Sequence, residues 1–308
     1  MDNISSEILY KDGFFKGNND LDIYYRGYAV KESKATIIIS HGFCESVEKY
    51  SELIRFFNEN NFSVYALDHR GHGKSGRLGI DKHQINVEKF NFYIDDFKIF
   101  LDTIVLKHLK DEKLFLFAHS MGGGIGALFL ERYTDYFDAA ILNCPMMEIE
   151  TGNYPPILSK ILSNIICKIG KDKQYIFGHG PFSKKSDLNS SGTSCEKRYN
   201  EYFNKQINYE HLQTSGGSFN WLNQSLKATN QLIKKDNAKK VEIPVLLFQA
   251  GRDTFVKPGG QNKFAKFAKN CTLIKIDDAK HEIYFEQDRI LKPYLEKVID
   301  FYNKNLSV

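Results

Sequence analysis

Residues 114–124 read Leu-Phe-Leu-Phe-Ala-His-Ser-Met-Gly-Gly-Gly, an apolar run that leads through a serine into three glycines. The first five residues have the length and character of a buried strand, and residues 121–133 have the composition of a helix. Small residues at Ala118 and Gly122 allow a tight turn between the two, which would hold Ser120 strained and exposed beside the N–H groups of the helix start. The pattern Gly-x-Ser-x-Gly is matched except that Ala118 replaces the first glycine. We therefore predict that Ser120 is a nucleophile.

Strands and helices alternate on both sides of this turn. Apolar or β-branched runs predict strands at residues 36–40, 62–67, 139–143, 244–250 and 272–276, and helical spacing predicts helices at 48–60, 90–109 and 288–303. Alternating apolar residues after the turn-like residues 17–20 predict a hairpin of edge strands near the start. This order is typical of a mostly parallel sheet covered by helices on both faces, so we predict an α/β fold.

The alternation stops between residues 145 and 240. We therefore expect a core formed by residues 1–144 and 241–308, and a helical cap, or lid, formed by residues 145–240 over the carboxyl ends of the strands. Seven apolar residues of this insertion share a helical stripe: Ile157, Leu158, Ile161, Leu162, Ile165, Ile166 and Ile169. This stripe could line a tunnel or face a membrane, but we expect it to pack against the sheet domain rather than to contact a membrane.

Composition bounds the remaining classes. Of the 308 residues, 42% are hydrophobic and 26% charged, as in ordinary globular proteins, and no run approaches the roughly 18 apolar residues of a membrane span. The first seven residues are polar and acidic, so we expect no secretory signal. The cysteines are Cys44, Cys144, Cys167, Cys195 and Cys271, and no pair has the spacing of a zinc site or disulfide framework. We expect a cytoplasmic protein with no metal, no cofactor and no nucleic-acid partner.

The net charge of +4 is unevenly placed. Residues 151–240 carry 14 Lys and Arg against 6 Asp and Glu, a net charge of +8, which leaves −4 for the rest of the chain. A basic segment of this kind would favour an anionic surface such as a membrane, whereas a solvated lysine-rich exterior is the simpler interpretation.

A serine hydroxyl needs a base, and the base needs an orienting acid. Asp253 follows the strand predicted at 244–250, and His281 follows the last predicted strand, in the order nucleophile, acid, histidine. Asp277 and Asp278 are competing acids, but they lie too near His281 on the same loop for comfortable geometry. We therefore predict that Asp253 orients His281 as general base.

Two backbone N–H groups should stabilise the developing oxyanion. The residue after the nucleophile, Met121, should supply one of them. The turn after the strand at 36–40 should supply the other, and we select Phe43 from residues 41–46.

Several motifs together resemble the monoglyceride lipase and lysophospholipase group of α/β-hydrolases, and bacterial lysophospholipases in particular. The motifs are Ser40-His41-Gly42, Asp68-His69-Arg70-Gly71-His72-Gly73-Lys74-Ser75, Ala118-His119-Ser120-Met121-Gly122-Gly123, Gly251-Arg252-Asp253 and Lys280-His281-Glu282. The resemblance covers about residues 13–302 and implies the α/β-hydrolase fold, a cap and acyl-ester hydrolysis. The family's triad falls on Ser120, Asp253 and His281. The cap is the least similar region.

These features predict a serine hydrolase that cleaves the ester of a single-chain lipid, a lysophospholipid or a monoacylglycerol, through an acyl-serine intermediate. A short-chain carboxylesterase or a peptidase of the same fold remains an alternative. An acyltransferase and a non-catalytic binding protein of this fold are further alternatives. The oligomeric state, the headgroup and the acyl length are left open.

Overall fold

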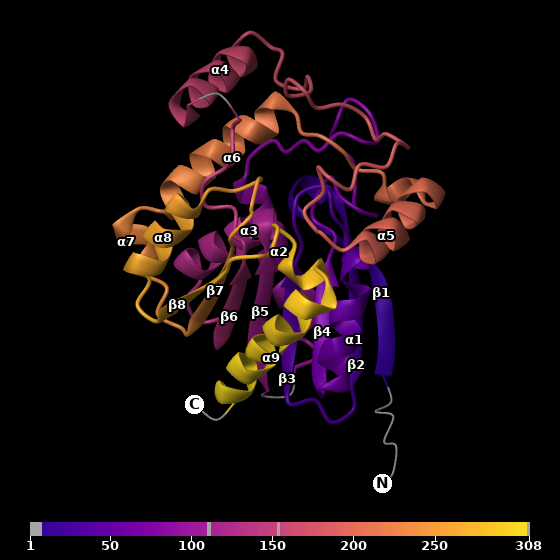
Figure 1. Ribbon diagram of the computed structural model, residues 1–308, viewed down its shortest axis with the longest axis vertical. Helices are drawn as coiled ribbons and strands as arrows, with labels where there is room; N and C mark the ends of the chain where they lie inside the picture. Colours follow the sequence, from indigo (N-terminus) through magenta and orange to yellow (C-terminus); the bar gives the residue numbers. More distant parts are fainter. Residues whose placement is uncertain (1–7, 110–111, 153–154, 307–308) are drawn as a thin grey trace.

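The structure, a computed structural model, describes residues 8–109, 112–152 and 155–306. Its centre is an eight-stranded sheet in the order β1-β2-β4-β3-β5-β6-β7-β8 (Figure 1). The strands are β1 (Ile8–Lys16), β2 (Asp22–Val30), β3 (Ala35–Ser40), β4 (Phe62–Leu67), β5 (Lys113–His119), β6 (Ala139–Asn143), β7 (Val245–Ala250) and β8 (Cys271–Ile276). β2 pairs antiparallel with β1 and β4, and the pairs from β4 across to β8 are parallel. The predicted mostly parallel sheet and the hairpin at its edge are confirmed.

Helices cover both faces of the sheet, because the strands between β3 and β7 carry apolar side chains on both sides. One apolar core joins the sheet to α1 (Ser51–Glu59) and α9 (Asp288–Lys304). A second core joins its other face to α2 (Asn91–Phe100), α3 (Ser120–Arg132) and α8 (Pro258–Phe267). The sequence analysis did not predict α8.

The helix predicted at 90–109 is shorter and less regular than expected. α2 ends at Phe100, and the chain continues as one π-helical turn, Leu101–Val105, in which the N–H of Leu106 donates to the carbonyl of Leu101 over 2.9 Å. The wider turn keeps Leu101 and Val105 buried, so the apolar face that the sequence predicted still packs on the sheet.

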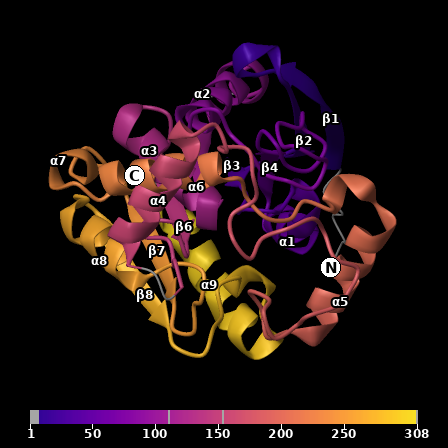
Figure 2. The same ribbon diagram turned by 90° about the horizontal axis from the view of Figure 1, so that it is seen from above.

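Residues 145–240 contribute α4 (Pro156–Lys168), α5 (Glu196–Asn208), α6 (Phe219–Leu232) and α7 (Lys235–Ala238). Figure 1 shows α4, α5 and α6 at one end of the sheet, and Figure 2 shows that α4 and α6 lie together, apart from α5. α6 contacts both α4 and α3, whereas Arg198 of α5 pairs with Glu52 of α1 over 2.7 Å. The segment is therefore attached to the core on two separate sides.

The stripe on α4 does not pack as expected. Only Ile166 is buried, and Leu162 is half-buried. The side chains of Ile157, Ile161 and Ile165 are 75%, 51% and 50% exposed. Seven apolar positions form too wide a stripe for one contact surface, so α4 packs through part of the stripe and leaves the rest exposed.

Among the described residues, no helix combines the length and the apolar character that crossing a bilayer requires.

Candidate active site

Ser120 lies at the junction of β5 and α3. Its φ of +52° is in the left-handed region, which non-glycine residues rarely adopt. The junction is held by the segment that follows the neighbouring strand β6, because the N–H of Met146 donates to the carbonyl of Ser120 over 2.8 Å. The side chain is 8% exposed, so its hydroxyl lies in a nearly closed site.

Gly122 allows the helix start to approach the end of β3. A Cβ atom at this position would lie 2.2 Å from the carbonyl oxygen of Ser40 and 2.5 Å from that of His41. Backbone atoms cannot move aside as a flexible side chain can, so only glycine fits. This close approach brings the turn after β3 beside Ser120.

The three predicted side chains meet at the carboxyl ends of β5, β7 and β8. Nε2 of His281 lies 2.8 Å from Oγ of Ser120, and Nδ1 of His281 lies 2.6 Å from Oδ2 of Asp253. The other carboxylate oxygen of Asp253 accepts the N–H groups of Phe255 and Val256 over 2.8 and 3.1 Å. Burial alone would raise the pKa of Asp253, but the hydrogen bond and charge of His281, with these two N–H groups, hold it below its usual value.

The competing acids lie elsewhere. Asp277 pairs with Lys275 over 2.5 Å, and Asp278 lies 3.4 Å from Arg289. The Nδ1 atom of His281 bonds to Asp253 instead.

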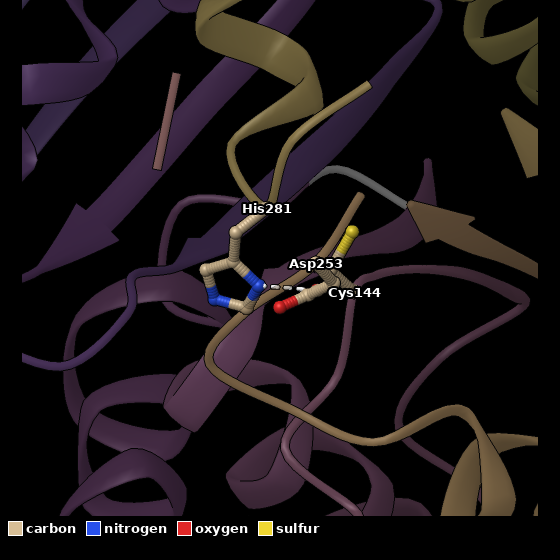
Figure 3. Close-up of side chains that lie close together, drawn as sticks. All are labelled: Cys144, Asp253 and His281. Carbon is tan, nitrogen blue, oxygen red and sulfur yellow. Dashed lines mark hydrogen bonds and ion pairs between the residues drawn. The ribbon is translucent and has the colours of Figure 1, made fainter. Parts of the chain in front are cut away.

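Cys144 follows β6 and lies beside the acid and the base (Figure 3). Ligand atoms of Cys144, Asp253 and His281 lie within 4.8 Å of one another, a residue set that could hold a metal ion. Two of these atoms are already joined by the 2.6 Å hydrogen bond, and burial raises the pKa of the Cys144 thiol, which opposes the thiolate that metals prefer. The arrangement therefore fits a hydrogen-bonded acid and base better than a resident metal.

Two backbone donors lie in the segments that adjoin Ser120. Among the described residues, no acceptor from another segment bonds the N–H of Phe43 or of Met121, and Met121 is in the first turn of α3, where an N–H has no acceptor within the helix. Cys44 has a φ of +59°, and Oε2 of Glu45 accepts the N–H of Gly42 over 2.6 Å, so the turn after β3 has a fixed shape. Neither N–H group is therefore committed to another acceptor.

The sequence analysis missed a group of buried polar side chains behind His281, which includes Glu45, Lys49, His119 and Glu282. The rings of His119 and His281 lie 4.8 Å apart, and Nε2 of His119 is 3.8 Å from Oε1 of Glu45. Burial lowers the pKa of His119 to about 3, so its ring is neutral beside His281 at neutral pH. One feature of the sequence indicated this group: Glu45 and Lys49 lie four residues apart, a spacing at which opposite charges can pair.

The comparison with known families agrees with this geometry. The family model described as serine aminopeptidase, S33, matches residues 31–288, which include Ser120, Asp253 and His281. The chain belongs to this family. The S33 family has the α/β-hydrolase fold, so the predicted fold class and family resemblance are confirmed.

Individual proteins that this S33 member resembles share less than a third of its residues. A Haemophilus influenzae protein named probable lysophospholipase L2 is 28% identical over 94% of this chain and 91% of that protein. Lysophospholipase L2 of Escherichia coli strain K12 is 28% identical over 95% of this chain and 87% of its own length. The solved structure of a soluble variant of monoglyceride lipase from Saccharomyces cerevisiae has a TM-score of 0.75 and 19% identity, and covers 97% of this chain and 96% of its own. That likeness shows the fold alone.

In this S33 chain, residues 189–195 are tied to the loop that carries His281. The N–H of Glu282 donates to the carbonyl of Gly192 over 2.7 Å, and the hydroxyl of Ser194 donates to Oε2 of Glu286 over 2.5 Å. The hydroxyl of Thr193 donates to the carbonyl of Phe285 over 2.8 Å. The side of the 145–240 segment that precedes α5 is therefore fixed to the histidine loop.

An apolar cavity of about 400 Å³ lies between α4 and α6. Its lining includes Leu158, Leu162, Ile176, Phe219, Trp221 and Leu222. The ring of Trp221 packs on that of Phe43, with centroids 4.0 Å apart. At another point of the wall, Ile149 forms a β-bridge with Val256, three residues beyond Asp253. The cavity thus adjoins both the turn after β3 and the loop of the acid.

Proposed function

We propose that this chain hydrolyses the carboxylic ester of a single-chain lipid, a lysophospholipid or a monoacylglycerol, through an acyl-serine intermediate. The observation that carries the proposal is the hydrogen-bonded series from Asp253 through His281 to Ser120, with distances of 2.6 and 2.8 Å. The names of the two bacterial lysophospholipases L2, which align along more than nine-tenths of this chain, support the substrate class.

The proposed reaction has two steps. Ser120 attacks the ester carbonyl while His281 takes the hydroxyl proton, and Asp253 holds the imidazole and stabilises its cationic form. The N–H groups of Phe43 and Met121 stabilise the oxyanion, each by about 100- to 1,000-fold in rate. His281 protonates the departing alcohol and then activates the water that cleaves the acyl-Ser120 ester.

We further propose that residues 145–240 form a cap and that the cavity between α4 and α6 takes the acyl chain. The cavity is supported in this role by its apolar lining and by the contact of Trp221 with Phe43, the proposed oxyanion donor. An acyl chain in this cavity would therefore lie next to the turn that carries Phe43.

The exposed stripe of α4 supports peripheral contact with an anionic membrane surface. Ile157, Ile161 and Ile165 stand on one side of the helix, and Lys160 and Lys168 are exposed on the same element. Apolar side chains flanked by cations bind the interface of anionic bilayers. All five cysteines are free, which is consistent with a cytoplasmic site of action.

The central test is hydrolysis of lysophosphatidyl lipids and monoacylglycerols at matched chain length. We expect one or both to be cleaved, and Ser120→Ala to lower kcat by about a million-fold. The exposed Ser183→Ala variant serves as control and should retain full activity. A Ser120→Ala enzyme with more than a few per cent of wild-type turnover would contradict the proposal.

The alternatives are separate arms of the same test. Faster cleavage of acetyl or butyryl esters than of long-chain esters would indicate a short-chain carboxylesterase, and cleavage of aminoacyl substrates would indicate a peptidase. Transfer of the acyl group to added glycerol would indicate an acyltransferase. Failure of a fluorophosphonate to label Ser120 would indicate a binding protein.

Membrane contact is tested by flotation with vesicles of neutral or anionic lipid. We expect salt-sensitive binding to anionic vesicles that is lost when Ile157, Ile161 and Ile165 are all changed to Glu. The control is Leu106→Glu, an exposed apolar residue that lies in the connection leading to the start of β5. Equal binding to both vesicle types would argue against the contact.

A further inference from the structure

A largely buried ion cluster of Glu45, Lys49 and Glu282 lies between the turn after β3 and the loop of His281. Nζ of Lys49 is 3.0 Å from Oε1 of Glu45 and 2.6 Å from Oε1 of Glu282. The three side chains are 5%, 9% and 15% exposed, so the ion pairs are shielded from water. Buried charges persist only when they are paired in good geometry, which makes their arrangement stiff.

One end of the ion cluster holds the turn after β3. Both oxygens of Glu45 are used: Oε2 accepts the N–H of Gly42 and the hydroxyl of Tyr50, each over 2.6 Å, and Oε1 accepts the hydroxyl of Tyr284 over 2.9 Å. A Cβ atom on Gly42 would lie 2.8 Å from Oε2 of Glu45, so the turn and the carboxylate fit closely. Gly42 precedes Phe43, whose N–H is the proposed oxyanion donor.

The other end holds the loop of the base. Glu282 follows His281 directly in the chain, and its own N–H is fixed by the carbonyl of Gly192. Tyr284 adds a second link, because its ring stacks on that of Tyr50 with centroids 4.6 Å apart. The ion cluster therefore joins the segment after β3 to the loop that carries His281. The bridging residues Lys49 and Glu282 are 233 positions apart in the sequence.

Lys49 and Glu45 are charged at neutral pH. Burial alone would lower the pKa of Lys49, but Glu282 and Glu45 raise it above its usual value. Burial alone would raise the pKa of Glu45, but Lys49 and the hydroxyl of Tyr50 hold it well below its usual value. Lys49 is also 5.4 Å from the ring centroid of Tyr202 and 5.3 Å from that of Phe285, so its ammonium group is enclosed.

We propose that Lys49 is a positioning residue, which fixes the distance between the oxyanion-binding turn and the histidine loop by bridging Glu45 and Glu282. The proposal rests on the proposed hydrolase function of Ser120, His281 and Phe43. Lys49 touches neither the substrate nor the reacting atoms, and it acts through the two carboxylates. Its loss changes the alignment of the oxyanion donor with the base, which matters in the transition state more than in substrate binding.

The test is the Lys49→Met variant, which keeps the length of the side chain and removes its charge. With active sites counted by burst titration, we expect kcat per site to fall about 10- to 100-fold while KM stays within threefold. Lys49→Arg, which can bridge both carboxylates, should restore kcat to within threefold of wild type. Lys98→Met is the matched control, because Lys98 of α2 pairs at the same four-residue spacing with Asp102 of the π-helical turn that follows, and kcat should not change.

A Lys49→Met enzyme with kcat per site within twofold of wild type would overturn the proposal. An equal fall in kcat for the Lys49→Arg variant would also overturn the proposal. A fall that the restored positive charge does not rescue would indicate a general packing defect. If Lys49→Met is not recovered folded, the isosteric Glu45→Gln variant takes its place, with the same expected fall in kcat and the same limit of twofold.

A second readout separates this proposal from the proposed function. Hydrogen exchange followed by mass spectrometry needs no activity, and Lys49→Met should raise exchange in peptides that cover both 41–50 and 281–287. If fluorophosphonate does not label wild-type Ser120, the hydrolase function fails, whereas unchanged exchange in either peptide overturns the bridge itself. Lys98→Met should leave both peptides as in wild type.

Discussion

Ser120 and Cys144 have left-handed backbone conformations at the ends of neighbouring strands, with φ values of +52° and +45°. Each such residue costs about 1–3 kcal/mol and persists only where its surroundings fix it. For Ser120 the fixing contact is visible in the hydrogen bond from Met146, and the glycines of α3 allow the necessary approach of backbone. The strain and the reactive hydroxyl therefore occupy the same residue.

The glycine at position 122 sets the packing of this junction. In Gly122→Ala, the new methyl group would collide with the carbonyl oxygens of Ser40 and His41, so we expect the free energy of unfolding to fall by about 3 kcal/mol or more. Urea denaturation measures the change. Gly180→Ala is the control, since no atom lies within 4 Å of the position that its new methyl group would take. An equal midpoint for both variants would contradict the argument.

Replacing Asp253 tests the assignment of the acid. Asp253→Asn keeps an acceptor for the N–H groups of Phe255 and Val256 but cannot stabilise a cationic His281, so kcat should fall about 10⁴-fold. Steady-state hydrolysis of an ester substrate gives the ratio. Asp278→Asn, at a competing acid paired with Arg289, should retain nearly full activity. The reverse ranking would move the acid to the histidine loop.

The sequence predicted Ser120, Asp253 and His281 because each follows a strand in a fixed chain order, and the structure brings their side chains together. It could not predict the contact between Lys49 and Glu282, which depends on how two distant loops fold toward each other. Spacing along the chain reports neighbours on one helix or strand, and it carries no information about such a meeting.

At the scale of elements, α3 buries an ionisable side chain, Glu131. Glu131 is 7% exposed, and within the described chain its Oε1 has no hydrogen-bond partner. Burial raises the pKa of this carboxyl to about 8 from its ordinary 4.5, against the opposing effect of Lys240 and Arg132. The folded state therefore binds this proton over a pH range in which the unfolded state has lost it.

The sign of the pH dependence follows. The Glu131 site costs no stability below pH 4.5, and its cost grows as pH rises toward 8, to an upper limit of about 5 kcal/mol. We expect Glu131→Gln to raise the melting temperature at pH 8.5 and to change it little at pH 4.5, as measured by calorimetry. The exposed Glu59→Gln should behave as wild type at both values. An equal rise in the melting temperature of Glu131→Gln at pH 4.5 and pH 8.5 would indicate an effect of packing rather than of protonation.

The elements that the sequence missed share a physical cause. α5 buries only Tyr202, and the other apolar residues at helical spacing, Tyr199, Phe203 and Ile207, are half-buried, so its apolar stripe is narrow and set among charged and amide residues. α8 begins at Pro258 and includes two glycines in its first turn, which favour a loop by local propensity. Both helices form because of contacts with the rest of the molecule. The apolar stripe correctly predicted that α4 is a helix. How much of the stripe is buried depends on which other elements pack against it, and the sequence does not show this.

At the scale of the whole molecule, the sheet order could not be read from the chain, because strand alternation does not reveal that β4 lies between β2 and β3. The sequence also does not reveal that residues 145–240 are attached to the core on two separate sides. The α4 and α6 side packs around an apolar cavity, and the residues before α5 are bonded to the histidine loop.

This asymmetry predicts unequal hydrogen exchange. Peptides that cover 155–170 should exchange faster than those that cover 189–195, because α4 is largely exposed whereas the N–H groups of Ser194 and Cys195 donate to Glu286 and Thr193. Glu286→Gln weakens the bond to Ser194, so exchange should rise in 189–195 and 280–287 together. Glu296→Gln on the exposed face of α9 is the control. A rise in only one of the two peptides would show that they are independent.

The bond between residues 189–195 and the histidine loop also has a consequence for engineering. We predict that grafts at residues 189–195 shift His281, the proposed general base, whereas exchange of residues 155–180 with those of a related enzyme leaves His281 in place. A change of chain-length preference should therefore be sought by recombining only that first portion. Chimeras with a junction between 180 and 189 should keep their turnover, and those with a junction inside 189–195 should lose it.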